Sequence, residues 1–196
     1  MARTDARSDR TRRTIKQVYL DLLEAGTEPI TISRLCAKAN IHRGTFYHHF
    51  ADIRDVRETL ETELFEDVAR QLQHENIASF SCDFFLRLID IVKRNRTLVS
   101  ATLTNLPDSC FFNNIVSYFR HKYLSAVEKE SAADKKEINS LFTYILYGFI
   151  GLLSEWLHAA DGETEQSLAE KASRFNRILT RSLTDGRHAA DRHTLP

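Results

Sequence analysis

The stretch that decides the fold is Thr31–Phe50, TISRLCAKANIHRGTFYHHF. Two apolar sets recur in it at helical spacing and predict two short helices: Ile32, Leu35 and Cys36, then Ile41 and Phe46. Asn40 lies between the sets, and asparagine enters the left-handed backbone conformation at low cost, so it can end the first helix and turn the chain. Two helices joined by a short corner predict a helix-turn-helix, whose second helix enters the major groove of DNA.

The second of these helices has a surface suited to a polyanion. Its expected exposed residues carry a cation, hydroxyls and imidazoles, with no acidic side chain: His42, Arg43, Gly44, Thr45, Tyr47 and His48. Phe46 and Phe50 are assigned to the core.

Length and composition predict an all-α chain that is long enough to bury a real core. It has 196 residues but only six glycines and three prolines, so turns are few. Formal net charge is zero, yet residues 1–50 hold nine Lys and Arg against five acidic residues, a net +4, which leaves −4 for the remainder. A basic N-terminal part on an acidic body is the asymmetry expected where one end meets phosphate.

The compartment predicted from the sequence is the cytoplasm, with no membrane partner. The three cysteines are far apart and form no CxxC pair, so we expect small core residues of a reduced protein. The Arg-rich N-terminus also contains Asp5 and Asp9, and no apolar run follows, which excludes a signal peptide. The longest apolar stretch, Leu141–Leu153, is shorter than the about 20 residues of a membrane-spanning helix.

About nine helices are expected, arranged as a three-helix head and a helical-bundle body. The predicted division is a basic arm at 1–8, a helix-turn-helix head at 9–50, a ligand-binding and dimerisation body at 51–185, and a flexible tail at 186–196. A helix of about 25 residues after Asp52 should lead from the head into the body. The sequence shows no strand alternation and no internal repeat.

The order of signals in the head is typical of one family. The first helix carries an Ile-x-x-Val-Tyr-x-x-Leu-Leu stripe that ends at Gly26, Thr31 opens the second helix, and Arg43–Phe50 runs directly into a fourth helix. Over Asp9–Leu60 the chain resembles the TetR (tetracycline-repressor/AcrR) family of bacterial regulators. The resemblance implies a homodimer, an all-helical ligand-binding body and a palindromic DNA operator.

Tyr147–Leu157, YGFIGLLSEWL, is similar to the C-terminal region of the dihydroxyacetone-kinase-regulator type within that family. Two positions in the head depart from the family pattern. His42 stands where Ser or Thr commonly caps the recognition helix. Ile53 stands where a Lys commonly meets phosphate, so either Arg54 takes that role or one phosphate contact is missing.

The candidate DNA-binding residues lie in or beside the helix-turn-helix: Thr31, Arg34, His42, Arg43, Gly44, Thr45, Tyr47, His48, His49 and Arg54. Arg43 can pair with guanine O6 and N7 or remain solvated, and Gly44 either permits close approach to DNA or simply starts a helix. Tyr47 can donate to a phosphate, be a half-buried ring, or both. The arginines of the N-terminal arm either meet DNA or form a solubilising tail.

The body should hold an effector pocket and a dimer interface. Candidates for the pocket are aromatic, with a few polar groups, and each alone can be core: Phe84, Leu88, Phe112, Tyr118, Phe119, Tyr144, Glu155 and Trp156. The helix predicted at 138–160 is apolar on two sides, so its second side and the last helix should meet a second copy. The expected interface residues are Tyr147, Gly148, Gly151, Leu168, Ala172, Phe175 and Leu179.

No chemistry beyond binding is expected. Cys36, His42, His48 and His49 lack the spacing of a zinc site, so neither a metal nor a cofactor is predicted. The chain has no nucleophile motif, no phosphate loop and no paired catalytic carboxylates, which argues against an enzyme. The partners predicted are a DNA operator, a second copy of the chain and an unknown small-molecule effector. The alternative is a co-regulator with the same fold that does not bind an operator.

Overall fold

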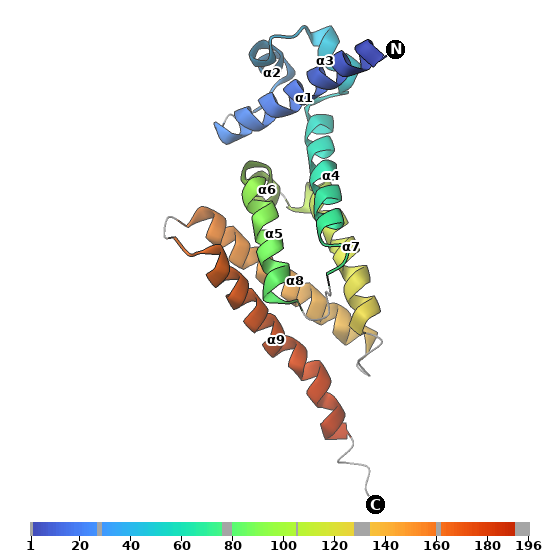
Figure 1. Ribbon diagram of the computed structural model, residues 1–196, viewed down its shortest axis with the longest axis vertical. Coiled ribbons are helices and arrows are strands. Elements are labelled where there is room, and N and C mark those ends of the chain that lie inside the picture. The colour runs from blue at the N-terminus through green and yellow to red at the C-terminus, as the bar shows by residue number, and fades with distance from the viewer. Residues whose placement is uncertain are drawn as a thin grey trace, which may run out of the picture. The chain divides into compact units, whose positions relative to one another are not determined.

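A computed structural model describes residues 2–26, 29–75, 80–104, 106–127, 134–159 and 162–190. Over these ranges it contains nine α-helices, one short 3-10 helix and no strand (Figure 1), which confirms the predicted all-α class. The helices are α1 (Ala2–Glu24), α2 (Ile32–Ala39), α3 (Arg43–His49), α4 (Ile53–Gln71), α5 (Cys82–Arg94), α6 (Arg96–Thr104), η1 (Leu106–Asp108), α7 (Cys110–Val127), α8 (Lys135–His158) and α9 (Glu165–Ala190).

The chain forms two compact units. Unit 1 comprises Met1–Glu66 and Asn95–Phe112, and unit 2 comprises Asp67–Arg94 and Asn113–Pro196. Helices α4 and α7 each begin in unit 1 and end in unit 2. Unit 1 therefore extends past residue 50 and includes most of α4 together with α6.

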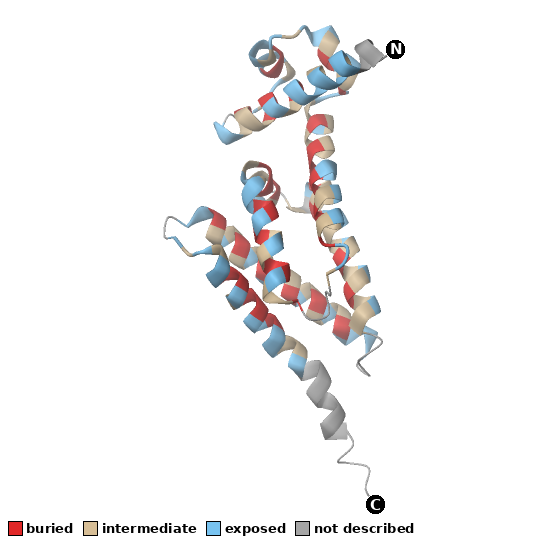
Figure 2. Cartoon of the chain, in the orientation of Figure 1, coloured by how far each residue is buried: buried red, intermediate tan, exposed pale blue. Residues whose placement is uncertain are grey.

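Unit 1 is built on α1, which packs against α2 and α6. Its core includes the apolar stripe of α1 and buried residues from α2 to α4, with Phe50 directly after α3 (Figure 2): Ile15, Val18, Tyr19, Leu22, Leu35, Cys36, Phe46, Phe50, Val56 and Leu60. Phe46 and Phe50 are 0% and 2% exposed, so both are core residues as predicted.

The corner between α2 and α3 follows its local sequence. Thr31 caps α2, because its Oγ1 accepts from the Arg34 backbone N–H at 3.3 Å. Asn40 ends the helix with φ 51° and ψ 49°, the left-handed conformation expected of it, and its N–H reaches the Ala37 carbonyl. His42 starts α3 without a side-chain cap hydrogen bond. The side-chain cap of Thr31 and the left-handed backbone of Asn40 thus set where α2 begins and where the chain turns toward α3.

Unit 2 packs α9 against α5 and α8. Its core is rich in buried aromatic rings that contact one another: Phe80, Phe84, Phe85, Phe119, Tyr123, Phe142 and Phe149. Tyr123 is fully buried among them, and burial raises the pKa of its phenol to about 12.

Helix ends differ from the sequence-based expectation at three places. Helix α1 begins at Ala2, within the arm predicted at residues 1–8, and residues 2–8 contain no Gly or Pro to stop it. Helix α4 has 19 residues and ends at Gln71, where a turn follows. Helix α9 continues to Ala190, into the tail predicted at residues 186–196, and residues 191–196 lie outside the described part.

Helix α8 is longer than its apolar stretch suggested. Its 24 residues are long and apolar enough to cross a membrane by length and composition. One of its sides is nevertheless buried inside unit 2, with Ile138, Phe142, Ile145, Phe149 and Leu153 below 10% exposure. Core helices pass the same test, so this feature alone does not indicate a membrane protein.

Candidate functional site

Helix α3 presents a polar, acid-free surface. Phe46 is its buried anchor, whereas His42, Arg43, Gly44 and His48 are exposed. Thr45 and His49 are half-buried. The short helix is therefore held by a single large side chain and leaves its remaining surface available to a ligand.

Arg43 is oriented by the preceding helix. Its Nη2 donates to the Ser33 hydroxyl of α2 at 2.7 Å. A guanidinium has five N–H donors, so this bond leaves others for a base edge or a phosphate. Thr31 and Arg34 are exposed at the start of the same helix α2.

Tyr47 packs against the core and is also exposed to solvent. Its ring meets the edge of Phe46, with ring centroids 5.6 Å apart and planes at 84°. The side chain is still 56% exposed. The ring is thus braced by the core, and this limits its conformational freedom before any contact with DNA.

His48 and His49 lie side by side at the end of α3, with ring centroids 5.1 Å apart. Burial lowers the pKa of His49, and the neighbouring His48 and Arg12 lower it further. Arg12 of α1 also stacks over the Phe50 ring at 5.2 Å. His49 is therefore held toward its neutral form beside an arginine from α1.

At the start of α4, Arg54 is already paired. Its Nε donates to Glu58 Oε1 at 2.6 Å, and this bond raises the Arg54 pKa. Ile53 is half-buried and, with Arg54 and Arg57, lines a cavity of about 390 Å³ in unit 1. A phosphate contact by Arg54 has to compete with Glu58.

The residues predicted for an effector pocket do not gather at one place. Phe84 and Phe119 are in the aromatic core of unit 2, whereas Phe112 belongs to unit 1. The Tyr118 hydroxyl donates to the Ala69 carbonyl at 3.3 Å, and Trp156 Nε1 donates to the Glu163 carbonyl at 2.8 Å. These two polar groups serve the fold. Of the remaining candidates, Leu88 is half-buried, and Tyr144 and Glu155 are exposed.

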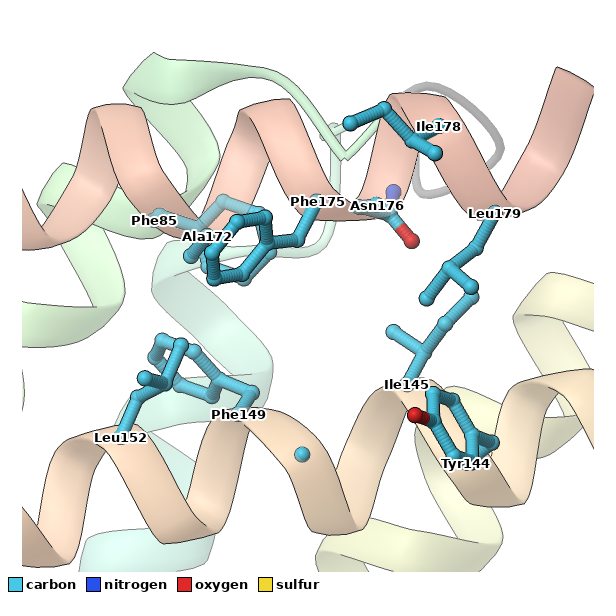
Figure 3. A pocket seen from close by; sticks show the side chains of 11 residues that line it. Phe85, Tyr144, Ile145, Phe149, Leu152, Ala172, Phe175, Asn176, Ile178 and Leu179 are labelled. Carbon is cyan, nitrogen blue, oxygen red and sulfur yellow. The ribbon is translucent and has the colours of Figure 1, made fainter.

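Unit 2 does contain a cavity of about 410 Å³ between α8 and α9 (Figure 3). Its lining is mostly apolar: Phe85, Tyr144, Ile145, Gly148, Phe149, Leu152, Ala172, Phe175, Asn176, Ile178 and Leu179. Tyr144 is the predicted pocket residue that lines it. Sequence reasoning missed Asn176, although a polar residue four positions after Ala172, within the apolar face of the last helix, was a usable signal.

The residues predicted for the dimer interface divide into two groups. Tyr147 and Phe175 are 52% and 44% exposed, and Gly148 and Gly151 are exposed with open space where a Cβ would lie. Leu179 is half-buried. Leu168 and Ala172 are buried within the protomer, where α9 packs on α5 and α8, so they are unavailable to a partner. The α9 residues predicted to form one interface therefore divide between the core of the protomer and its exposed surface.

Comparison with known proteins agrees with this architecture. The TetR_C_8 model, a transcriptional regulator C-terminal region, matches residues 81–177. The uncharacterised HTH-type transcriptional regulator YxbF of Bacillus subtilis (strain 168) is 36% identical over 111 residues, which are 56% of this chain and 28% of that protein. The chain thus spans a little over a quarter of that relative's length.

Two solved structures share the fold. A TetR transcriptional regulator from Streptococcus agalactiae has a TM-score of 0.65 at 21% identity and covers 88% of this chain and 97% of its own. Thermus thermophilus FadR, a TetR-family repressor in complex with lauroyl-CoA, has a TM-score of 0.57 at 17% identity and covers 85% and 93%. With the helix-turn-helix of α2 and α3, the match over residues 81–177, the HTH-type relative and the shared fold support a TetR-family transcriptional regulator.

Proposed function

We propose that the chain is a cytoplasmic, homodimeric repressor that binds a palindromic DNA operator and releases it in response to a small molecule, and that it has no enzymatic activity. The observation that carries the proposal is the exposed, acid-free surface of α3. A short helix of this kind, held by one buried Phe46, is suited to the DNA major groove.

Three residues on this surface have chemical roles in the proposed contact with DNA. Arg43 is at the N-terminal end of α3, where side chains reach base edges, and it favours guanine. Thr45 can offer its methyl group to thymine or its hydroxyl to a phosphate, and Tyr47 donates to a phosphate. Arg34 and the exposed arginines of α1 add phosphate contacts, which makes affinity steeply dependent on salt.

Dimerisation is supported by an exposed apolar face on α8 and α9. Tyr144, Tyr147, Phe175 and Ile178 are large hydrophobic residues that are 44–67% exposed on these two helices. The open space at Gly148 and Gly151 permits a second backbone to approach closely. Two copies are needed because two recognition helices one DNA turn apart, about 34–36 Å, read both halves of a palindrome.

Response to a ligand follows from two conformations of the dimer. A ligand that prefers a different conformation of the body shifts the long helix α4 and changes the separation of the recognition helices. The change in DNA affinity is at most the ligand's differential affinity for the two states. The T. thermophilus relative described above is a repressor in complex with lauroyl-CoA, which supports ligand responsiveness here. The resemblance of Tyr147–Leu157 to the dihydroxyacetone-kinase-regulator type stays a prediction.

The test is a fluorescence-anisotropy titration of the purified protein on DNA from the region upstream of its own coding sequence. Arg43→Ala should weaken binding by about tenfold or more, because each arginine–guanine pair contributes about 1–3 kcal/mol. Arg177→Ala on α9 removes the same charge and serves as the control. Affinity for the upstream DNA that is no higher than for random DNA would refute the proposal.

A co-regulator without operator binding is the second candidate. Two contacts favour it, since Arg54 is paired with Glu58 and Arg43 with Ser33. Its signature in the same titration is an Arg43→Ala variant that binds as weakly as the unaltered protein, at unchanged thermal stability.

A further inference from the structure

The cavity between α8 and α9 extends into unit 2. Phe85, Ile145, Phe149 and Ala172 line it and are each 9% exposed or less, whereas other lining residues are open to solvent. At about 410 Å³ it falls within the range of about 300–1,000 Å³ typical of small-molecule sites. The cavity is therefore large enough for a small molecule, and its buried lining residues form what we call its inner wall.

The inner wall contains one unsatisfied polar side chain. Asn176 is 2% exposed, and neither its Nδ2 nor its Oδ1 has a hydrogen-bond partner in the described part of the chain. Figure 3 shows its amide oxygen directed into the gap between α9 and α8. Leaving such an amide unpaired is unfavourable, and a leucine at this position would avoid that cost.

The rest of the lining restricts the chemistry of an occupant. Apart from Asn176 and Tyr144, every lining residue is apolar, and the lining contains no charged side chain. An ionic group would be desolvated there without a counter-charge, which is strongly unfavourable. A neutral molecule with a mainly apolar body fits these walls.

We propose that this cavity binds a small, largely apolar molecule with one neutral group that both donates and accepts hydrogen bonds, such as a carboxamide, and that Asn176 recognises this group. This inference rests on the proposed function in one respect only, since it takes the bound molecule to be the effector that releases DNA. The binding itself needs no DNA.

A second copy of the chain is the competing occupant. Tyr144, Gly148 and Phe175 belong both to the cavity and to the exposed face proposed for dimerisation. A second protomer would cover these exposed residues, whereas Asn176 is only 2% exposed and offers little surface to another protomer. A molecule small enough to enter the cavity fits Asn176 better.

The test measures binding of two matched probes, 2-naphthamide and 2-methylnaphthalene, to the full-length protein without DNA by isothermal titration calorimetry. The unaltered protein should bind 2-naphthamide about tenfold more tightly, since pairing the buried amide recovers about 1–3 kcal/mol. Asn176→Leu should bind both probes within about twofold of each other. This variant should stay folded, because it removes an unsatisfied amide.

Two glycine variants separate the cavity from the dimer face. Gly148 lines the cavity, whereas Gly151, one helical turn later, does not, and a Cβ at either meets nothing within 4 Å. Gly148→Leu should abolish binding of both probes, and Gly151→Leu should preserve it. Leucine also favours a helix more than glycine does, so both variants should fold.

Three results would overturn the proposal: no binding of either probe, equal affinity for both, or a preference that persists in Asn176→Leu. Loss of binding in Gly151→Leu as complete as in Gly148→Leu would assign the cavity to a second copy. Operator affinity is measured separately by anisotropy. Probe binding with no operator binding would contradict the proposed function and leave the site standing.

Discussion

At the scale of single residues, Asn40 is the position on which the helix-turn-helix depends most. Its φ of 51° lies in the left-handed region, where most side chains are strained by about 1–2 kcal/mol. Asn40→Ala should therefore lower the free energy of unfolding by about 1–2 kcal/mol, and Asn40→Gly should lower it much less. Urea denaturation followed by circular dichroism measures both. Equal losses for the two variants would contradict the backbone explanation.

His49 should make stability depend on pH. Burial first, then His48 and Arg12, lower its pKa in the folded chain below the unfolded value of about 6.5. Between the folded pKa of His49 and about pH 6.5, the unfolded state binds more protons than the folded state. The stabilisation is therefore complete above about pH 6.5 and is lost as pH falls through the folded pKa. Thermal melts at pH 7.5 and pH 5 should differ less for His49→Gln than for the unaltered protein. An identical pH dependence would count against this account.

Prediction from the sequence succeeded for residues whose conformation or burial is set by their immediate neighbours in the chain. The left-handed Asn40, the Thr31 cap and the buried Phe46 follow from local chemistry alone. The pairing of Arg43 with Ser33 and of Arg54 with Glu58 was not predictable, because it depends on which rotamer of a long side chain is adopted.

At the scale of helices, a buried carboxylate in unit 1 joins α4 to the start of α7. Glu61 is 1% exposed, and its Oε2 accepts from the Ser109 hydroxyl at 3.0 Å and from the Phe111 N–H at 3.1 Å. Ser109 Oγ in turn accepts from the Phe112 N–H at 3.0 Å, so it caps α7. Glu61 thus places a negative charge at the positive end of α7.

Removing this carboxylate should be costly. Glu61→Ala leaves the buried Ser109 hydroxyl and the part-buried Phe111 N–H without their acceptor and removes the ion-pair partner of Arg57, so it should lower the free energy of unfolding by about 2–4 kcal/mol. Glu61→Gln keeps an acceptor oxygen and should cost less. The control is Glu58→Ala on the same helix, whose exposed pair with Arg54 is screened by solvent and should contribute little. Chemical denaturation of the three variants decides, and equal losses for Glu61→Ala and Glu58→Ala would contradict the role of the buried contact.

Helix identity was predictable from apolar periodicity, whereas helix ends were not. Helix α1 extends farther toward the N-terminus and α9 farther toward the C-terminus than predicted, because the polar sequence of these flanks has no apolar periodicity from which a helix end could be located. Leu168 and Ala172 were read as interface residues because periodicity shows which residues are apolar, not which neighbour covers them. Glu61 was missed for a related reason, since its partners lie about fifty residues away in the sequence.

At the scale of the whole molecule, the proposed function depends on symmetry. One α3 presents few base-reading side chains, and an affinity useful in a cell requires two of them on one duplex. The exposed face of α8 and α9 is the surface that we propose for a second copy. The family was predictable from the head alone, whereas the cavity beside Asn176 became visible only when α8 and α9 were placed side by side.

Selection of binding sites from random double-stranded DNA by the purified protein tests whether the chain recognises a specific DNA sequence as a dimer. We expect an enriched palindrome whose half-site centres lie about 10–10.5 base pairs, or a multiple of this, apart, bound by two or more chains in even number. We also expect that Arg43→Ala loses enrichment at one position in each half-site while Arg177→Ala keeps it. Recovery of no sequence above the random background, at any salt concentration that leaves the protein folded, would contradict the proposed function.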